Sequence, residues 1–311
     1  MTKRIKAALI ITSCIIISIV LIFKAAGPRK TSPVKGEAAM PRLETKAQDE
    51  ISGLIAKEDY PKAIKLLNDI MEKYPLSSRE EQALYTLASI YDTRGELLRE
   101  RDVYKNILEK FPASDFAAKA RARLDEANIK ILFSPTPDPD SFTHEIGRGD
   151  TLSKIAKKSN TTVDLLMKTN NLKDGAIKAG RKLKVTKLKF SISVDKSQNI
   201  LTLKGDDRIL KTYQVATGIN NCTPVGSFKI INKVVDPVWY TQQAVVPAGS
   251  PKNILGSRLM GISVPGYGIH GCTDPSSIGK QATAGCIRMH NSDVEELYAI
   301  VPVGTEIIVE D

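Results

Sequence analysis

Cysteine and histidine are the residue types in this chain that are best suited to covalent chemistry, and one of each lies close together near the C-terminus. Cys286 lies in the run TAGCIRMH, and His270 lies in the run YGIHG. A cysteine becomes a nucleophile when a neighbouring base or cation ionises its thiol. Gly285 permits a sharp turn that exposes the thiol and presents backbone N–H groups as an oxyanion hole. The pattern therefore predicts nucleophilic catalysis by Cys286.

Three histidines are the candidate bases for this nucleophile. His144 belongs to a smaller module upstream, whereas His290 follows Cys286 by four residues and would be its neighbour on a helix. We favour His270, because glycines flank both it and Cys286 and give the two groups open, turn-like placements. A buried, inert thiol is the alternative for any isolated cysteine.

The four cysteines, at 14, 222, 272 and 286, contain no CxxC pair, and with only three histidines the sequence argues against a metal site. Cys14 lies in an apolar N-terminal run, so three cysteines remain outside it. Because three thiols cannot all pair, at least one of them stays free.

The sequence predicts that the elements that position Cys286 and His270 are mainly β-strands. From Lys189 onward, runs such as SISVD, NILTLKG, GSFKIINKVV and TEIIVED alternate apolar and polar residues between turn residues. The region predicts a mainly-β, sandwich- or barrel-like domain with few helices, one of them around residues 294–300.

Residues 189–311 resemble an L,D-transpeptidase catalytic domain of the YkuD type. The matching runs follow in order: VATG (215–218), TPVGSFKI (223–230), NILGSRLMGIS (253–263), YGIHG (267–271), SIG (277–279) and TAGCIRM (283–289). The resemblance implies that Cys286 is the nucleophile, His270 the general base and the Gly271 carbonyl the group that holds the imidazole tautomer. The residues that it implies for the substrate pocket are Arg288, Thr283, Gly285 and Tyr267, with Arg288 suited to a substrate carboxylate.

Two positions depart from the family pattern. Ala284 stands where family members usually carry a histidine directly before the Gly-Cys pair. Cys272 stands where threonine is common, which places a second thiol near the site; it is either inert or paired with Cys222.

The reaction implied is acyl transfer in two steps without a metal or organic cofactor. Cys286 attacks a tetrapeptide stem of peptidoglycan, releases terminal D-alanine and forms a thioester. An amine of a neighbouring stem then gives a cross-link between third residues. With water as acceptor the enzyme would be a carboxypeptidase, and a degenerate domain would leave a non-catalytic wall-binding scaffold.

Residues 142–187 form a smaller βααβ module. The runs GDTL and TVDLLMKTN predict two short helices between two strands, and Asp150 is the expected cap of the first helix. The segment resembles a LysM domain over its whole length, a class that binds glycans containing N-acetylglucosamine. By that resemblance the glycan contacts are Gly149, Asp150, Thr151, Leu152 and Asn170. Such a module beside the catalytic domain raises the local substrate concentration.

Residues 45–132 predict an all-α region. NDIMEKYPLSS (68–78) aligns with KNILEKFPASD (105–115) at an offset of 37 residues, which resembles tetratricopeptide-type helical repeats. The region is either a small scaffold or a groove for a partner protein. Proline-containing linkers are expected at 30–44 and 133–141.

The N-terminus and the net charge indicate the cell envelope. Residues 7–23 are uncharged and apolar over a length that can cross a bilayer, so we expect residues 1–29 to hold a cytoplasmic tip and a transmembrane signal anchor. A cleaved signal peptide, or acylation at Cys14, is the alternative. The net charge of +10 favours an anionic surface, and without a recognition helix or aromatic-basic repeat it favours the wall or inner membrane over nucleic acid.

Overall fold

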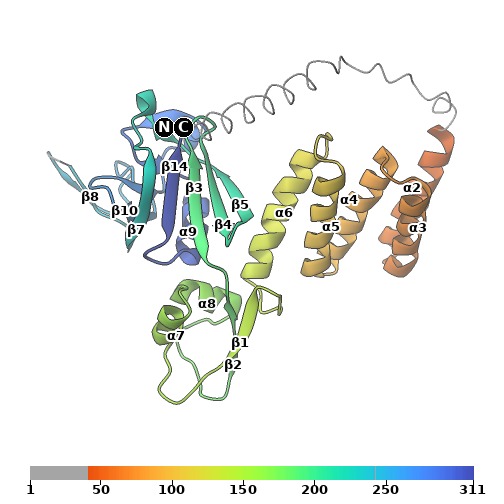
Figure 1. The fold of residues 1–311 in the computed structure, drawn as a ribbon, viewed down its shortest axis with the longest axis horizontal. Coiled ribbons are helices and arrows are strands. Elements are labelled where there is room, and N and C mark those ends of the chain that lie inside the picture. The colour runs from red at the N-terminus through yellow and green to blue at the C-terminus, as the bar shows by residue number, and fades with distance from the viewer. Residues whose placement is uncertain (1–40, 242) are drawn as a thin grey trace, which may run out of the picture. The chain divides into compact units, whose positions relative to one another are not determined.

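The computed structural model describes residues 41–241 and 243–311 (Figure 1). The chain divides into two compact units between Glu58 and Asp59. The described part of the first unit is one helix, α2 (Pro41–Ala56). It begins at Pro41 and not at Thr45, so the helical region starts earlier than the sequence pattern indicates. Proline fits the first turn of a helix because the N–H groups there have no intrahelical partner.

Between residues 59 and 132 the structure has four helices, each of which packs against the next. Asp59 and Ser77 cap two of them by accepting a backbone N–H at the helix start. Two helices stop at Tyr74 and Phe111, which share nearly the same backbone conformation and the sequence offset of the repeat. The repeated sequence therefore folds into repeated helix ends. The helices are α3 (Tyr60–Lys73), α4 (Ser78–Thr93), α5 (Leu97–Lys110) and α6 (Ala117–Leu132).

The expected βααβ module is confirmed. Strands β1 (Ser141–Glu145) and β2 (Lys182–Thr186) pair antiparallel, and the helices α7 (Leu152–Lys158) and α8 (Val163–Thr169) lie between them in the chain. The cap of α7 is Thr151, whose hydroxyl accepts the Lys154 N–H, so the expected cap Asp150 is wrong by one residue. The Asp150 carboxylate accepts hydrogen bonds from Gly147 and His144.

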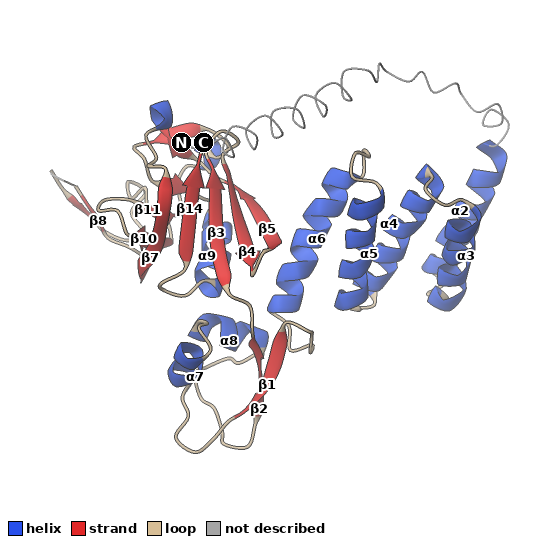
Figure 2. Ribbon diagram, viewed as in Figure 1, coloured by secondary structure: helices blue, strands red, loops and turns tan. Residues whose placement is uncertain are grey.

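From residue 189 on, the described strands form a mainly-β domain, as predicted (Figure 2). Its main sheet has the order β13-β11-β10-β7-β14-β3-β4-β5, in which β14 runs parallel to β3 and antiparallel to β7. The elements are β3 (Phe190–Asp195), β4 (Ile200–Gly205), β5 (Arg208–Gln214), β6 (Thr217–Gly218), η2 (Ile219–Asn221), β7 (Gly226–Val235), β8 (Trp239–Tyr240), β9 (Val245–Val246), β10 (Arg258–Ile262), β11 (Gly268–His270), η3 (Pro275–Ser277), β12 (Gln281–Thr283), β13 (Ile287–Arg288), α9 (Asn291–Ile300) and β14 (Glu306–Glu310).

Alternation along these strands builds the core of the catalytic domain. In β3, for example, Ile192 and Val194 are buried while the residues between them are partly exposed. The single described α-helix of this region, α9, packs against β10 and β11 and buries Val294 and Leu297 in the same core. The strand that carries His270 is therefore held between neighbouring strands and this helix.

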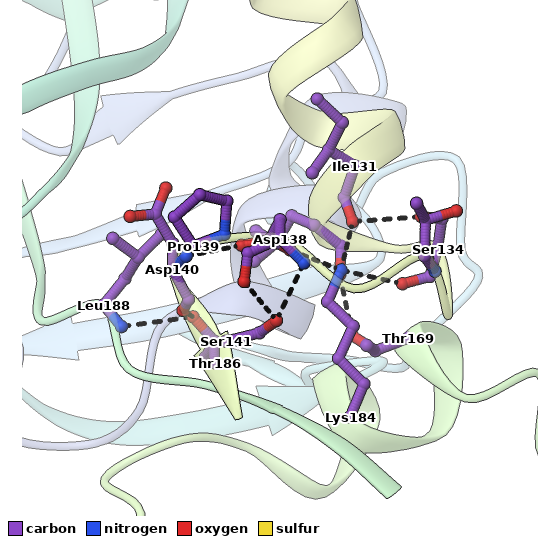
Figure 3. A network of polar contacts seen from close by, with 12 residues as sticks. Ile131, Ser134, Asp138, Pro139, Asp140, Ser141, Thr169, Lys184, Thr186 and Leu188 are labelled. Carbon is purple, nitrogen blue, oxygen red and sulfur yellow. Dashed lines mark hydrogen bonds and ion pairs between the residues drawn. The ribbon is translucent and has the colours of Figure 1, made fainter. Parts of the chain in front are cut away.

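Buried polar contacts join the small module to its neighbours in the second unit (Figure 3). The Lys184 ammonium contacts the Asp138 carboxylate at 2.6 Å and donates to the carbonyls of Ile131 and Ser134 at 2.9 and 3.0 Å. Thr169 donates to the Leu132 carbonyl at 2.8 Å. The proline-containing segment 133–141 leads into β1 along the chain and is also bound to β2 by the Lys184 side chain.

The predicted membrane anchor at 7–23 lies outside the described residues. Within the part of the chain that the structure describes, no helix has the length and apolar character that a membrane span requires.

Candidate active site

Cys286 lies in a tight turn between β12 and β13. Gly285 adopts a φ of +124°, which favours glycine, and a Cβ there would lie 2.5 Å from Cε1 of Tyr267. The Thr283 hydroxyl accepts the Gly285 N–H at 3.1 Å and donates to the Cys286 carbonyl at 2.6 Å. The Thr223 hydroxyl donates to the Gly285 carbonyl at 2.8 Å. The turn that carries Cys286 is thus fixed on both sides of Gly285.

These contacts decide which backbone group of the turn is left for a substrate. Because the Gly285 N–H already donates to Thr283, it does not point freely into the site. The Cys286 N–H has no hydrogen-bond partner among the described residues. Of the backbone N–H groups expected to form an oxyanion hole at this turn, the Cys286 N–H is therefore the one that is available to a substrate.

His270 lies on β11, which pairs in parallel with β13, so that the residue after Cys286 is the direct neighbour of Ile269. The imidazole is buried, and its Nδ1 lies 2.7 Å from the Gly271 carbonyl oxygen. A carbonyl oxygen can only accept, so Nδ1 carries the proton and Nε2 keeps a lone pair. This is the tautomer that a general base needs.

The surroundings of the thiol and of the imidazole favour the neutral form of each group at pH 7. Burial lowers the pKa of His270 to about 4, which the hydrogen bond to Gly271 only partly opposes. Burial raises the pKa of the Cys286 thiol, while a backbone N–H of Gly268 and the charge of Arg288 pull it the other way. The Cys286 sulfur lies 3.6 Å from the Gly266 carbonyl oxygen. Both shifts favour a neutral thiol and a neutral imidazole over a thiolate–imidazolium ion pair in the free site.

Arg288 brings a positive charge to this site. Its Nη1 donates to the Ser277 hydroxyl at 3.0 Å, and its buried Nε has no partner among the described residues. Its charge acts to lower the pKa values of His270, Cys286 and Cys272. The site is thus electropositive, which suits a substrate that carries a carboxylate.

The remaining candidates do not contribute to this pair. Among the described residues Cys222, Cys272 and Cys286 are all free thiols, so the pairing considered for Cys222 and Cys272 is not formed. Cys272 is buried, and burial raises the pKa of its thiol. His290 is the exposed residue before α9, and because strand β13 separates it from Cys286, the two are not neighbours on a helix.

Two polar residues at the site were not singled out by the sequence. Thr223 accepts the Gly218 N–H and donates to Gly285, and Asn291 binds the loop that follows His270. The sequence offered only weak signals for them: Thr223 opens the run TPVG, and Asn291 stands where a helix begins. Neither signal shows which backbone groups the side chain reaches.

The loop expected to bind glycan is held by its own contacts. The Asp150 carboxylate accepts the Gly147 N–H at 2.8 Å and the His144 Nε2–H at 3.1 Å. Gly149 has a φ of +85°, and its carbonyl accepts the Lys154 ammonium at 2.9 Å. The loop is therefore shaped before any ligand arrives.

The other expected glycan contacts have different surroundings. Thr151 is exposed and caps α7, whereas Leu152 is buried in the module's core. The Asn170 amide donates to the carbonyls of Leu166 and Lys184 and accepts the Lys184 N–H. Because two of these bonds join the end of α8 to β2 and the third closes the last turn of α8, the Asn170 side chain maintains the module's fold.

Comparisons with known proteins match the mainly-β domain and the small module to two families. The L,D-transpeptidase catalytic domain family, YkuD, matches residues 189–309, and the LysM domain family matches residues 144–186. The putative L,D-transpeptidase YkuD of Bacillus subtilis is 36% identical over 175 residues, which is 54% of this chain and 98% of that protein. Its counterpart in Bacillus licheniformis is 37% identical over 172 residues, which is 53% of this chain and 96% of that protein.

Among solved structures, an L,D-transpeptidase from Mycobacterium tuberculosis H37Rv is 18% identical over 43% of this chain and 63% of its own, with a TM-score of 0.35. The family assignment rests on the Bacillus relatives, which this chain covers almost completely. The chain belongs to the L,D-transpeptidase family and is a cysteine-dependent peptidoglycan acyltransferase with a LysM domain.

Proposed function

We propose that Cys286 and His270 carry the two half-reactions of this L,D-transpeptidase. The observation that supports this is the bond from His270 Nδ1–H to the Gly271 carbonyl, which leaves the Nε2 lone pair as the proton acceptor. As the sulfur attacks the stem carbonyl carbon, the thiol proton moves to Nε2. The C–N bond then breaks, the imidazolium protonates the leaving amine of D-alanine, and a thioester remains on Cys286.

The second half-reaction reverses these proton movements. An acceptor amine attacks the thioester carbonyl and gives its proton to His270 Nε2, and the departing thiolate takes that proton back. The oxyanion in both steps would lie at the Cys286 N–H, which has no other partner in the described chain. We assign Arg288 to a stem carboxylate, and Thr283, Gly285 and Tyr267 to the shape of the pocket.

Mass spectrometry of peptidoglycan fragments tests this assignment. Incubation with disaccharide tetrapeptides should give dimers linked between third residues, and the intact protein should carry a tripeptide thioester. Cys286→Ala and His270→Gln should give neither product, whereas Cys222→Ser, which changes another exposed thiol, should behave as the wild type. Trimmed tripeptides without dimers would instead identify water as the acceptor, and no modified stem at all from folded protein would refute the assignment.

We also propose that the LysM module binds glycan at the loop of Gly149, Asp150 and Thr151. Leu152, in the core, and Asn170, between α8 and β2, hold the module in the shape that this loop requires. The preformed loop and its exposed threonine support this placement. In a sedimentation assay with insoluble peptidoglycan, the double variant Thr151→Ala/Gly149→Val should lose most of the binding that the wild type shows. Binding unchanged from the wild type would move the glycan site elsewhere on the module.

Peptidoglycan as substrate places the protein in the cell envelope, and we propose that residues 7–23 anchor it in the inner membrane. Fractionation of the full chain against a variant that begins at residue 30 tests the anchor, which predicts membrane association of the full chain only. For the helices α3–α6 we propose tetratricopeptide-like stacking with a surface for a protein partner. The repeated helix ends at Tyr74 and Phe111 support this.

A further inference from the structure

The peptide bond between Gly271 and Cys272 is bound at both of its polar groups. Its carbonyl oxygen accepts the His270 Nδ1–H at 2.7 Å, and its N–H, that of Cys272, donates to Oδ1 of Asn291 at 3.1 Å. A peptide unit is planar, so fixing the direction of its N–H also fixes the direction of its carbonyl. We propose that Asn291 is a positioning residue for the general base, which it orients through this peptide.

Asn291 makes two further hydrogen bonds, one to the same loop and one to the segment that precedes β10. Its Nδ2 donates to the Cys272 carbonyl at 2.9 Å, and its Oδ1 also accepts the Ser257 N–H at 3.2 Å. Two backbone N–H groups converge on one amide atom, so that atom must be the oxygen, and the orientation of the amide follows from its partners. The loop cannot rotate its carbonyl away from His270 without breaking these bonds.

The glycines around Asn291 show how closely the amide is packed. A Cβ on Gly271 would lie 2.1 Å from the Asn291 Oδ1, and a Cβ on Gly256 would lie 2.3 Å from it. Real Cβ atoms do not approach an oxygen so closely, so both positions must be glycine for the amide to reach the backbone. The glycine after His270 therefore serves the Asn291 contact as well as the imidazole contact.

The same bond acts on the basicity of the imidazole. A peptide that donates its N–H becomes a stronger acceptor at its carbonyl, because hydrogen bonds in a chain polarise one another. The stronger acceptor favours the Nδ1–H tautomer and stabilises the imidazolium that forms during catalysis. This opposes burial and the charge of Arg288, which both act against protonation of His270.

Helix α9 supplies the rigid support for this arrangement. Asn291 is the first residue of α9, whose buried side chains pack into the domain core, and α9 packs against the strand of His270. The position of the amide is thus set by the core and not by a mobile loop.

The inference rests on the proposed role of His270, and a spectroscopic readout separates the two. In protein with ¹⁵N-labelled histidine, NMR reports which ring nitrogen of His270 carries the proton, whether or not the enzyme turns over, and His270→Gln identifies its signals. We expect Nδ1–H in the wild type. Asn291→Ala should populate the other tautomer and lower kcat about 10- to 100-fold with little change in KM, because a misplacement of a catalytic group by about 1 Å can cost about 100-fold.

Asn291→Asp is the conservative comparison, and Asn232→Ala is the matched control. A carboxylate can accept the same two N–H groups but cannot donate to the Cys272 carbonyl, so Asn291→Asp should keep the Nδ1–H tautomer and lose less of kcat than Asn291→Ala, and its added charge should move the acid limb of the pH profile upward. Asn232 accepts the Gly261 N–H at 3.0 Å between β7 and β10, so its loss should leave the tautomer of His270 unchanged.

A wild-type tautomer and wild-type kcat in folded Asn291→Ala would overturn the inference while leaving the function of His270 intact. If Asn291→Ala does not fold, an unmoved acid limb in Asn291→Asp would overturn it instead. A wild-type enzyme that forms no thioester would refute the proposed function, whatever the tautomer.

Discussion

Alkylation of Cys286 by iodoacetamide measures the protonation state of the thiol in the free enzyme, because only the thiolate reacts. The site combines a buried imidazole, whose pKa lies at about 4, with a thiol whose pKa burial raises. Neither group is charged near neutral pH. We therefore expect the thiol to ionise only as the pH approaches its own raised pKa, without help from a protonated His270.

The expected size of the effect follows from the thiolate fraction. A thiol with an ordinary pKa of about 8.5 is about 3% ionised at pH 7, and a raised pKa makes that fraction smaller. The alkylation rate should therefore rise about tenfold for each pH unit between 6 and 8. An ion pair would behave differently, with a rate that reaches its plateau well below pH 7 and stays there until the imidazolium loses its proton.

The assay follows the Cys286 peptide by mass spectrometry, since exposed Cys222 also reacts. His270→Gln should leave the alkylation profile nearly unchanged but abolish thioester formation, because the histidine is needed only when a substrate is attacked. Turnover of the wild type should persist down to about pH 5, since His270 stays unprotonated there. A flat alkylation rate from pH 5 to pH 8 that disappears in His270→Gln would refute the neutral pair.

Three further changes test other parts of the structure. Gly285→Ala should lower kcat about 100-fold in a folded protein, because the φ of +124° and the Tyr267 ring leave no room for a Cβ; Ala284→Ser, one residue away and exposed, is its control. Lys184→Met leaves the buried Asp138 carboxylate without its ion-pair partner and should cost about 3–5 kcal/mol in denaturant unfolding, whereas Lys62→Met, which removes an exposed ion pair, should leave the unfolding midpoint nearly unchanged. Burial raises the pKa of Asp125 to about 6, so the folded state holds its proton more tightly than the unfolded state, and stability should fall by at most about 3 kcal/mol as the pH rises from 4 to 6. Asp125→Asn should remove that fall, and a slope equal to that of the wild type would exclude Asp125 as its source.

The sequence predicted the features that depend on local pattern. The strands of the catalytic domain follow from alternation, and the paired glycine-flanked runs around His270 and Cys286 led to the two groups that the structure places on adjacent elements. The resemblance to the family then named the Gly271 carbonyl, which the structure places against the imidazole. These features could be predicted because each depends on a short run of neighbouring residues.

Features that depend on contacts between distant residues could not be predicted. Asn170 falls in the expected glycan groove, yet its amide is used between α8 and β2, a pairing that only the folded module creates. Thr223 is distant in sequence from Gly285, whose carbonyl it holds. Thr151 and not Asp150 caps α7, because the Asp150 carboxylate accepts hydrogen bonds from His144 and Gly147.

In the proposed mechanism, the Gly271 carbonyl allows the buried His270 to serve both half-reactions. A carboxylate in that place would add a negative charge beside the imidazole, raise its pKa and favour an ion pair with Cys286. Burial lowers the pKa of His270 to about 4, and the neutral carbonyl, which fixes the same tautomer, opposes that shift only in part. Nε2 is then free to accept a proton from the thiol in the first step and from the acceptor amine in the second. An amine that attacks the thioester thus meets an unprotonated base, which is what transfer between stems requires.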